Sequence, residues 1–282
     1  MTGLSALTGL LQECTLRLDT ADGPSGSAFF IAPDYAVTAA HVVGGVRQDV
    51  ALTLPPDTWE GVVEDTRPPA GAARAPGELY PPPDVALIRI RSGSAHMCVL
   101  LAADRPPEWA RVMAYGYSRS FSRQAVTAET ETFEVTGELE TTDPSCVLLK
   151  IGRGQAVPGM SGAPVLDQDA GNIIGMLRTS RNPDTSLGGW VVPASVIRQL
   201  WPEQAAAGND RFHDQDGRWR SAVLQHMQDR QRGTPAAAGH VSIGTVYGGP
   251  VTVITGGQFR DITIGRDGPA SGRNGAGGPG QA

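Results

Sequence analysis

Short stretches with the pattern of β-strands, separated by turns rich in glycine and proline, run through the first 193 residues. Polar and apolar residues alternate at residues 15–20, and short apolar runs follow at 27–31 and 35–38, a rhythm typical of all-β proteins. The 36 glycines and 22 prolines among 282 residues favour turns over long helices. About a dozen such strands precede residue 193, which predicts two small antiparallel barrels in tandem.

The remaining strand candidates have the same length and the same bounding turns. They lie at residues 50–54, 61–65, 85–88, 111–117, 133–139, 146–151, 163–166, 173–177 and 189–192. A short helical turn is expected at residues 39–41, where two alanines precede a histidine. Residues 67–83 are rich in Pro, Gly and Ala and predict a long loop, and loops of this length are usually functional or disordered.

Composition divides the chain into four segments. Residues 1–203 hold the predicted strands and a helix at 193–201. Residues 204–240 are predicted to be a linker with one amphipathic helix at 217–232, whose candidate buried face is Trp219, Val223, His226 and Met227. Residues 241–265 carry short alternating segments about ten residues apart, which predict a β-repeat, with a flexible tail as the alternative. Residues 266–282 are glycine-rich and predicted to be disordered.

Charge and the lengths of apolar runs exclude several classes of protein. The net charge is −6 and the pI about 5.4, and no basic face stands out for nucleic acid or an anionic membrane. No apolar run approaches the roughly 18 residues of a membrane span. Residues 1–11 lack the basic start of a secretory signal, so we expect a cytoplasmic protein.

The cysteines and most histidines predict no metal or cofactor site. Cys14, Cys98 and Cys146 are few, odd in number and far apart, so we expect buried free thiols. No Cys-x-x-Cys spacing is present. Four histidines lack carboxylate or cysteine partners at metal spacing and are expected at the surface: His96, His213, His226 and His240.

Ser161 lies in a stretch, residues 158–164, that glycines and prolines enclose. Glycines let the backbone turn tightly and approach a substrate closely. A serine hydroxyl is a poor nucleophile alone and needs a base, which a carboxylate in turn orients. His41, after a predicted strand, and Asp84, at the start of another, are the candidates for these two groups.

Three short motifs follow one another along the chain: Thr38-Ala39-Ala40-His41, Asp84-Val85-Ala86-Leu87-Ile88 and Gly159-Met160-Ser161-Gly162-Ala163-Pro164. In order and approximate spacing they resemble the histidine, aspartate and serine motifs of trypsin-like (chymotrypsin-fold) serine proteases, of the compact bacterial type without disulfides. Ala163 stands where the family has the second glycine of its Ser-Gly-Gly sequence. The resemblance covers roughly residues 14–200.

This resemblance implies two six-stranded antiparallel β-barrels with the catalytic residues between them. Ser161 would be the nucleophile, His41 the general base and acid, and Asp84 the group that orients His41. The backbone N–H groups of Gly159 and Ser161 would form the oxyanion hole. No cofactor or metal is implied.

The resemblance also places a substrate pocket. Gln155, six residues before the serine, would line it, and its walls would come from Leu177, Arg178, Thr179 and Ser180. A neutral amide does not select a basic side chain as a carboxylate would. We therefore expect a preference for acidic or small residues rather than Arg or Lys.

Two functions remain open on the sequence alone. The first is a serine endopeptidase acting on proteins or peptides through an acyl-enzyme. The second is a non-catalytic or latent protease-fold module in a bacterial signalling or defence system, which binds a partner or itself through residues 241–265. An esterase of the α/β-hydrolase fold does not fit, because its Gly-x-Ser-x-Gly serine would precede the acid and the histidine.

Overall fold

Twelve strands form two closed six-stranded barrels within the residues that the computed structural model describes, namely 2–21, 23–69, 80–118, 126–141, 146–180 and 188–233. The first barrel consists of β1 (Thr15–Thr20), β2 (Gly23–Ala32), β3 (Tyr35–Thr38), β4 (Asp49–Leu54), β5 (Asp57–Arg67) and β6 (Val85–Ser92). The second consists of β7 (Arg111–Ser118), β8 (Thr127–Glu140), β9 (Val147–Gly152), β10 (Pro164–Asp167), β11 (Ile173–Ser180) and β12 (Gly189–Pro193).

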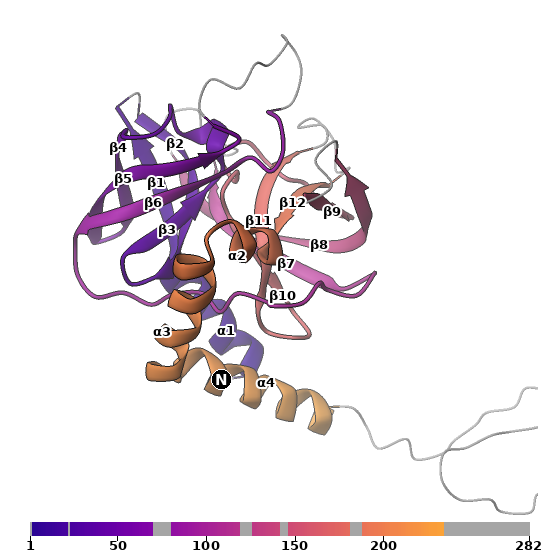
Figure 1. Ribbon diagram of the computed structural model, residues 1–282. Coiled ribbons are helices and arrows are strands. Elements are labelled where there is room, and N and C mark those ends of the chain that lie inside the picture. The colour runs from indigo at the N-terminus through magenta and orange to yellow at the C-terminus, as the bar shows by residue number, and fades with distance from the viewer. Residues whose placement is uncertain are drawn as a thin grey trace, which may run out of the picture. The chain divides into compact units, whose positions relative to one another are not determined.

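All neighbouring strands are antiparallel, in the order β1-β2-β3-β6-β5-β4 and β10-β11-β12-β9-β8-β7 (Figure 1). The predicted all-β class and the two six-stranded barrels are confirmed. Closure of each barrel leaves no free strand edge.

Strand β2 shows why its apolar run is continuous rather than alternating. Successive side chains of a strand point to opposite faces. Ala28 and Phe30 join the core of the first barrel, whereas Phe29 and Ile31 join a second cluster that also holds Leu148 of the second barrel. Both faces of β2 are therefore buried, and the strand lies at the junction of the two barrels.

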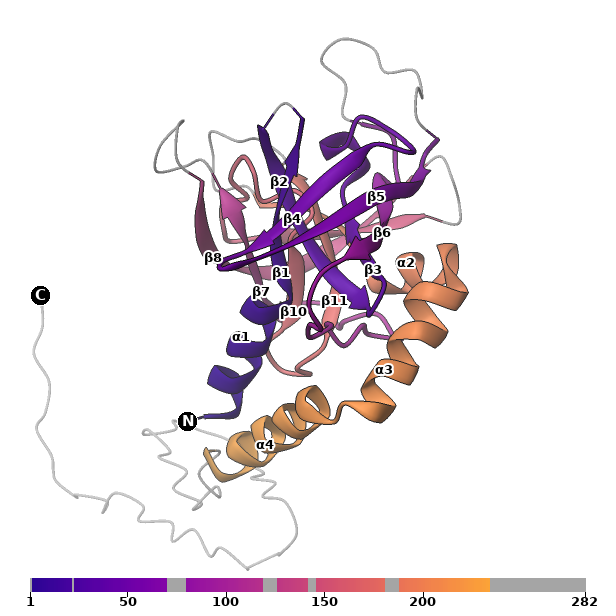
Figure 2. The ribbon, with the colours of Figure 1, turned by 90° about the vertical axis from the view of Figure 1, so that its left-hand side faces the viewer.

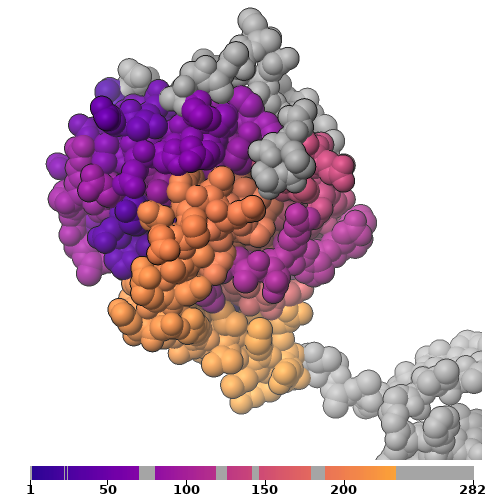
Figure 3. All heavy atoms as spheres, viewed as in Figure 1, coloured from indigo at the N-terminus to yellow at the C-terminus, as the bar shows by residue number. Residues whose placement is uncertain are grey.

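Helices cover one end and one side of the barrels. They are α1 (Gly3–Cys14), the 3₁₀ turn η1 (Ala40–Val42), α2 (Ala194–Leu200), the π-helical segment η2 (Pro202–Gly208), α3 (Asn209–Gln215) and α4 (Arg218–Gly233). Helix α2 lies against β11 and β12, while η2 and α3 lie against β2. Figure 3 shows this C-terminal helical segment, in orange, covering part of one face of the molecule. Helices α1 and α4 pack side by side, and the Gly3 N–H donates to Asp229 Oδ2 at 2.8 Å (Figure 2).

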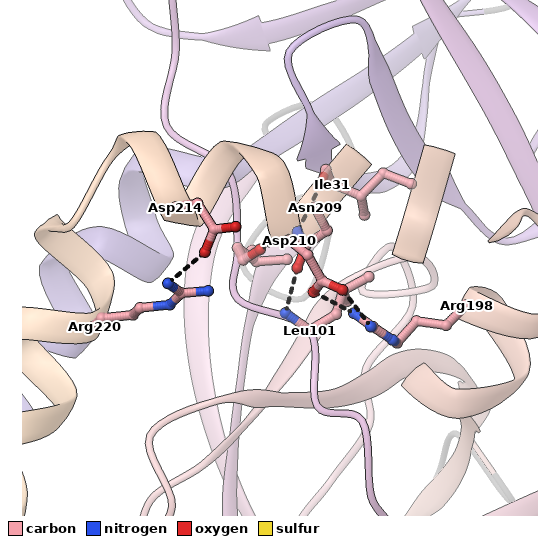
Figure 4. A network of polar contacts seen from close by, with 8 residues as sticks. Ile31, Leu101, Arg198, Asn209, Asp210, Asp214 and Arg220 are labelled. Carbon is pink, nitrogen blue, oxygen red and sulfur yellow. Dashed lines mark hydrogen bonds and ion pairs between the residues drawn. The ribbon is translucent and has the colours of Figure 1, made fainter. Parts of the chain in front are cut away.

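The expected linker after residue 203 is helical up to Gln215. Asn209 explains why this segment is folded. Its buried amide nitrogen donates to the carbonyls of Ile31 and Val99 at 2.7 Å each, and its oxygen accepts from the Leu101 N–H at 3.1 Å (Figure 4). A polar, alanine-rich segment is thereby tied to the chain that joins the barrels, which composition does not reveal.

Two ion pairs connect the same helices along their exposed sides. Arg198 of α2 pairs with Asp210 of α3, and Arg220 of α4 pairs with Asp214 of α3 (Figure 4). Exposed pairs of this kind contribute about 0–1 kcal/mol each. The buried Asn209 contacts therefore account for more of the docking than the ion pairs do.

Helix α4 matches the predicted amphipathic helix within one residue at each end. Trp219 is fully buried and donates to Gly171 O at 2.8 Å, and His226 is 5% exposed. Met227, which was expected on the same face, is 43% exposed. The apolar face is thus narrower than the sequence predicts.

The surface positions expected for the histidines are wrong for His213 and His226, which are 1% and 5% exposed. His213 contacts Val99 O at 2.9 Å, and burial lowers its pKa. His96 stacks on Phe30 with ring centroids 3.4 Å apart, and burial lowers its pKa too. His213 and His226 are thus buried residues that contact backbone carbonyls, and His96 is partly buried beside Phe30. His240 lies outside the described residues.

The three cysteines are buried free thiols, as predicted. No described helix is long and apolar enough to cross a membrane. Residues 241–265 and 266–282 lie outside the described residues, and so does most of the long loop at 67–83. The repeat, the tail and the cytoplasmic location stay predictions.

Candidate active site

His41 is presented by a turn at the end of β3. The strand ends at Thr38, whose hydroxyl donates to Ser27 O at 2.7 Å. Ala39 and Ala40 are buried, so only small side chains fit where the chain leaves the barrel. The turn η1 then places His41 with its side chain 28% exposed.

Asp84 lies immediately before β6 and is 1% exposed. Its φ of 60° falls in the left-handed region, which Asp tolerates better than most residues. Its Oδ1 accepts the His41 backbone N–H at 3.0 Å, and its Oδ2 lies 2.8 Å from His41 Nδ1. A carboxylate only accepts hydrogen bonds, so Nδ1 carries the hydrogen and Nε2 is left as an acceptor.

A third donor to Asp84 comes from the other barrel. Arg178 Nε donates to Asp84 Oδ2 at 3.0 Å. Arg178 was predicted on a pocket wall, and its side chain is only 4% exposed and is paired with Asp84. The β11–β12 pairing contains a bulge between Leu177 and Thr179, and a bulge re-aims the side chain it carries. The sequence held one signal for this contact, namely an arginine next to a buried apolar run, because a buried charge needs a partner.

The Ser161 turn uses some of its N–H groups and leaves others free. The bonded ones are Met160 to Val157 O (3.2 Å), Gly162 to Leu177 O (2.8 Å) and Ala163 to Met160 O (2.9 Å). The N–H groups of Gly159 and Ser161 have no acceptor among the described residues. Gly159 has a φ of 99°, which glycine adopts without strain. The two unbonded groups are the ones predicted to form the oxyanion hole.

Ser27 of β2 fastens this turn to the first barrel. Its N–H donates to Ser161 O at 2.9 Å, and its hydroxyl donates to Gly159 O at 3.2 Å while accepting the Tyr117 N–H at 2.8 Å. At Gly162 (φ 91°) an added Cβ would lie 1.9 Å from Ser27 O, so this approach requires glycine. Sequence reasoning missed Ser27, since a serine in a strand carries no recognisable motif.

The structure brings Ser161 to the same junction as His41 without joining them by a hydrogen bond. A Cβ built on Gly26 would lie 2.8 Å from Val42 and 2.9 Å from Ser161 O, so the backbone of the serine turn lies close to the turn that bears His41. No hydrogen bond between the Ser161 hydroxyl and the His41 ring is present in the described part of the chain. In proteins without substrate such bonds are often long and tighten on binding.

The other predicted pocket residues have mixed surroundings. Leu177 is buried and Gln155 is exposed. Thr179 and Ser180 pair with Trp190 and Gly189 of β12. The preference for acidic or small side chains therefore stays a prediction. Among the described residues, no group of three or more His, Cys, Asp or Glu is placed to hold a metal ion.

The sequence matches the trypsin-like peptidase domain over residues 26–176, which is more than half of the chain and contains all three motifs. The chain belongs to the trypsin-like peptidase family. Among curated proteins no sequence matches this peptidase significantly.

Solved structures share the fold of this trypsin-like peptidase at low sequence identity. The inactive form of the Rv3671c protease of M. tuberculosis is 18% identical, with a TM-score of 0.51 over 71% of this chain and 92% of that one. The serine endoprotease from Yersinia pestis is 11% identical, with a TM-score of 0.54 over 73% and 67% of the two chains. The HtrA-type protease AlgW with decapeptide is 14% identical, with a TM-score of 0.53 over 73% and 68%.

Proposed function

We propose that this trypsin-like peptidase is a serine endopeptidase that hydrolyses peptide bonds through Ser161, His41 and Asp84. The observation that carries the proposal is the 2.8 Å contact between His41 Nδ1 and the buried Asp84 carboxylate. It leaves His41 Nε2 as the basic atom, as a serine nucleophile requires. Family membership supports the same reaction class.

In the first half of the reaction, Ser161 Oγ attacks the carbonyl carbon of the substrate, and its proton passes to His41 Nε2. The C=O electron pair moves onto oxygen and gives a tetrahedral oxyanion. As the C–N bond breaks, His41 returns the proton to the leaving amine, and an ester of Ser161 remains. Asp84 stabilises the imidazolium that exists between these steps.

In the second half, water attacks the ester carbonyl while His41 Nε2 takes its proton. The bond from the carbonyl carbon to Ser161 Oγ breaks, the proton returns to Oγ, and the carboxylic acid product leaves. The oxyanion of each half would be met by the Gly159 and Ser161 N–H groups. Losing one such donor typically costs about 10²–10³ in rate.

A fluorophosphonate probe tests the proposal directly, because it forms a covalent bond with an activated serine. The full-length wild type should label, and Ser161→Ala should not. Because neutral His41 is the base, labelling should slow as the pH falls and the imidazole is protonated. Equal labelling of wild type and Ser161→Ala would contradict Ser161 as the nucleophile.

A latent or non-catalytic protease-fold module is the second candidate function. It is favoured by the lack of a hydrogen bond between the Ser161 hydroxyl and His41 among the described residues. In that case a partner would have to move Ser161 into reach, and residues 241–265 are the proposed contact. Removing residues 234–282 should then change activity or oligomeric state. A truncated protein that behaves as wild type would argue against this role of the tail.

Primary specificity is tested by cleavage of a random peptide library. We propose that cuts follow acidic or small residues, because the neutral Gln155 does not select a cation. A dominant cut after Lys or Arg would show that this part of the proposal is wrong, while leaving the reaction class intact.

A further inference from the structure

Asp84 belongs to a buried ion pair that joins the two barrels. Arg178 and Asp84 are 4% and 1% exposed, and Arg178 Nε lies 3.0 Å from Asp84 Oδ2. Among the ion pairs within the described part of the chain, both side chains are more than nine-tenths buried in this one alone. Removing one partner of such a pair leaves the other charge without compensation.

The same short piece of β11 contacts both the serine turn and Asp84. Leu177 O accepts the Gly162 N–H at 2.8 Å, and the Leu177 N–H donates to Ala163 O at 2.7 Å. The next residue, Arg178, is the unpaired residue of the β11–β12 bulge and contacts Asp84. Two consecutive residues of the second barrel thus fix the position of the serine turn relative to the Asp84 carboxylate.

The arginine shares an acceptor atom with His41. Asp84 Oδ2 receives both His41 Nδ1 and Arg178 Nε. A carboxylate that already faces a fixed cation attracts a second cation less strongly, and a guanidinium repels an imidazolium directly. Protonated His41 is therefore stabilised less than it would be beside Asp84 alone.

We propose that Arg178 is a positioning residue that fixes Asp84 between the barrels and keeps His41 in its neutral, basic form down to lower pH. The inference rests on the proposed function of His41 as the general base. Arg178 contacts none of the reacting atoms and acts only through Asp84. With Arg178 present, the endopeptidase would stay active at a more acidic pH than a variant that lacks this arginine.

The contacts of the described residues place three charged or titratable groups around the His41 site, Arg178 through its bond to Asp84. They are Asp84 from the start of β6, Arg178 from β11 and Tyr80, whose ring centroid lies 6.2 Å from that of His41. Burial, followed by the charge of Asp84, raises the pKa of Tyr80, so its phenol stays neutral throughout the relevant range. Arg178 is thus the one fixed cation among these groups.

The test follows the titration of His41 by NMR in the full-length protein with ¹⁵N-labelled histidine. His41→Gln assigns the signals. Arg178→Gln and Arg178→Met both remove the positive charge. Of these two, only Arg178→Gln keeps a donor for Asp84 Oδ2. Arg178→Lys keeps a cation. In the neutral variants the His41 midpoint should move to higher pH by roughly one unit, the lower end of the effect of a neighbouring charge. Arg178→Lys should titrate close to wild type.

A second readout is the rate of fluorophosphonate labelling from about pH 5 to 9. In the neutral variants the acid limb should move to higher pH together with the NMR midpoint. The plateau rate should fall by roughly 10-fold, because Asp84 loses one of its anchors. Arg198→Met serves as the matched control: it also breaks an arginine–aspartate pair, with Asp210 on α3, and should change neither readout.

The outcomes separate this inference from the proposed function. A folded neutral variant in which His41 titrates with wild type would overturn the inference. So would loss of folding, by circular dichroism, in both neutral variants but not in Arg178→Lys, because Arg178 would then act only as structure. If wild type does not label but the His41 midpoint still moves as expected, the proposed function fails, while the effect of Arg178 on the protonation of His41 stands.

Discussion

The two barrels contribute to the candidate site in opposite ways. On the side of the first barrel, both oxygens of Asp84 accept hydrogen bonds, and His41 is held through its backbone and through Nδ1. On the side of the second barrel, the turn around Ser161 keeps two N–H groups and one hydroxyl without partners among the described residues. One half is satisfied within the protein, and the other half offers groups that a substrate can meet.

Burial explains how both halves are stable. A buried polar group without a partner costs about 1–3 kcal/mol, and Asp84 at 1% exposure has no access to water that could relieve this cost. Gly159 and Ser161 are only half-buried, so solvent can reach the turn when no substrate is bound. The comparison predicts that changes on the Asp84 side affect the base, and changes on the serine side affect the oxyanion donors.

The largest effect is expected for Asp84→Asn. The amide would favour the wrong tautomer of His41 and remove the charge that stabilises the imidazolium. The fluorophosphonate labelling rate should fall by about 10⁴-fold. Asp167→Asn is the control, since Asp167 is also buried but accepts only from its own turn. Nearly normal labelling of Asp84→Asn would show that the Asp84 side of the site does not control the base.

Gly162→Ala should have the next largest effect. Its Cβ would overlap Ser27 O, and its φ of 91° strains any L-residue. Displacing the turn should cost about 10²–10³ in labelling rate, the effect of losing one oxyanion donor. Gly137→Ala is the matched control, since it has a φ of 142° but open space around it. If both variants label alike, the close approach to Ser27 is not required.

Ser27→Ala tests the fastening of the serine turn without adding bulk. It leaves the buried Tyr117 N–H without its acceptor and frees Gly159 O. Stability should fall by about 1–3 kcal/mol in urea titrations, and labelling by roughly 10-fold because the turn loosens. The NMR titration of His41 should not change. A shifted His41 midpoint would show that the two halves of the site are coupled. Ser25→Ala is the control and should leave stability, labelling and the His41 titration unchanged.

The smallest effect concerns stability in acid. Burial lowers the pKa of both His96 and His213 in the folded protein, so the unfolded chain binds protons more readily than the folded one. Stability should therefore be full above about pH 6.5 and decline as pH falls below it. Thermal unfolding between pH 7 and 5 measures the decline, and His96→Gln with His213→Gln should flatten it. An unchanged slope would show that carboxylates dominate instead.

The strands were predictable because their signals are local. Alternation and bounding turns located all twelve strands, and the motif Thr38-Ala39-Ala40-His41 indicated the 3₁₀ turn at η1. The helix at 209–215 was missed because its stability comes from Asn209, whose partners are distant in sequence. Helix α1 was also missed, although Leu7, Leu11 and Cys14 recur at helical spacing on its buried face and the helix packs against α4.

The sequence by itself determined which side chains can perform chemistry, because the motifs around His41, Asp84 and Ser161 depend on residue type and order along a short stretch. Only the tertiary structure decided which residues contact one another. Arg178 and Asp84 are 94 positions apart, and Ser27 and Gly159 are 132 apart. Both contacts require the two closed barrels to pack together, as β1 and β2 do against β7, and a bulge in β11 to aim one guanidinium inward. Such contacts depend on strand register and barrel closure, which are properties of the packed chain rather than of any local run of residues.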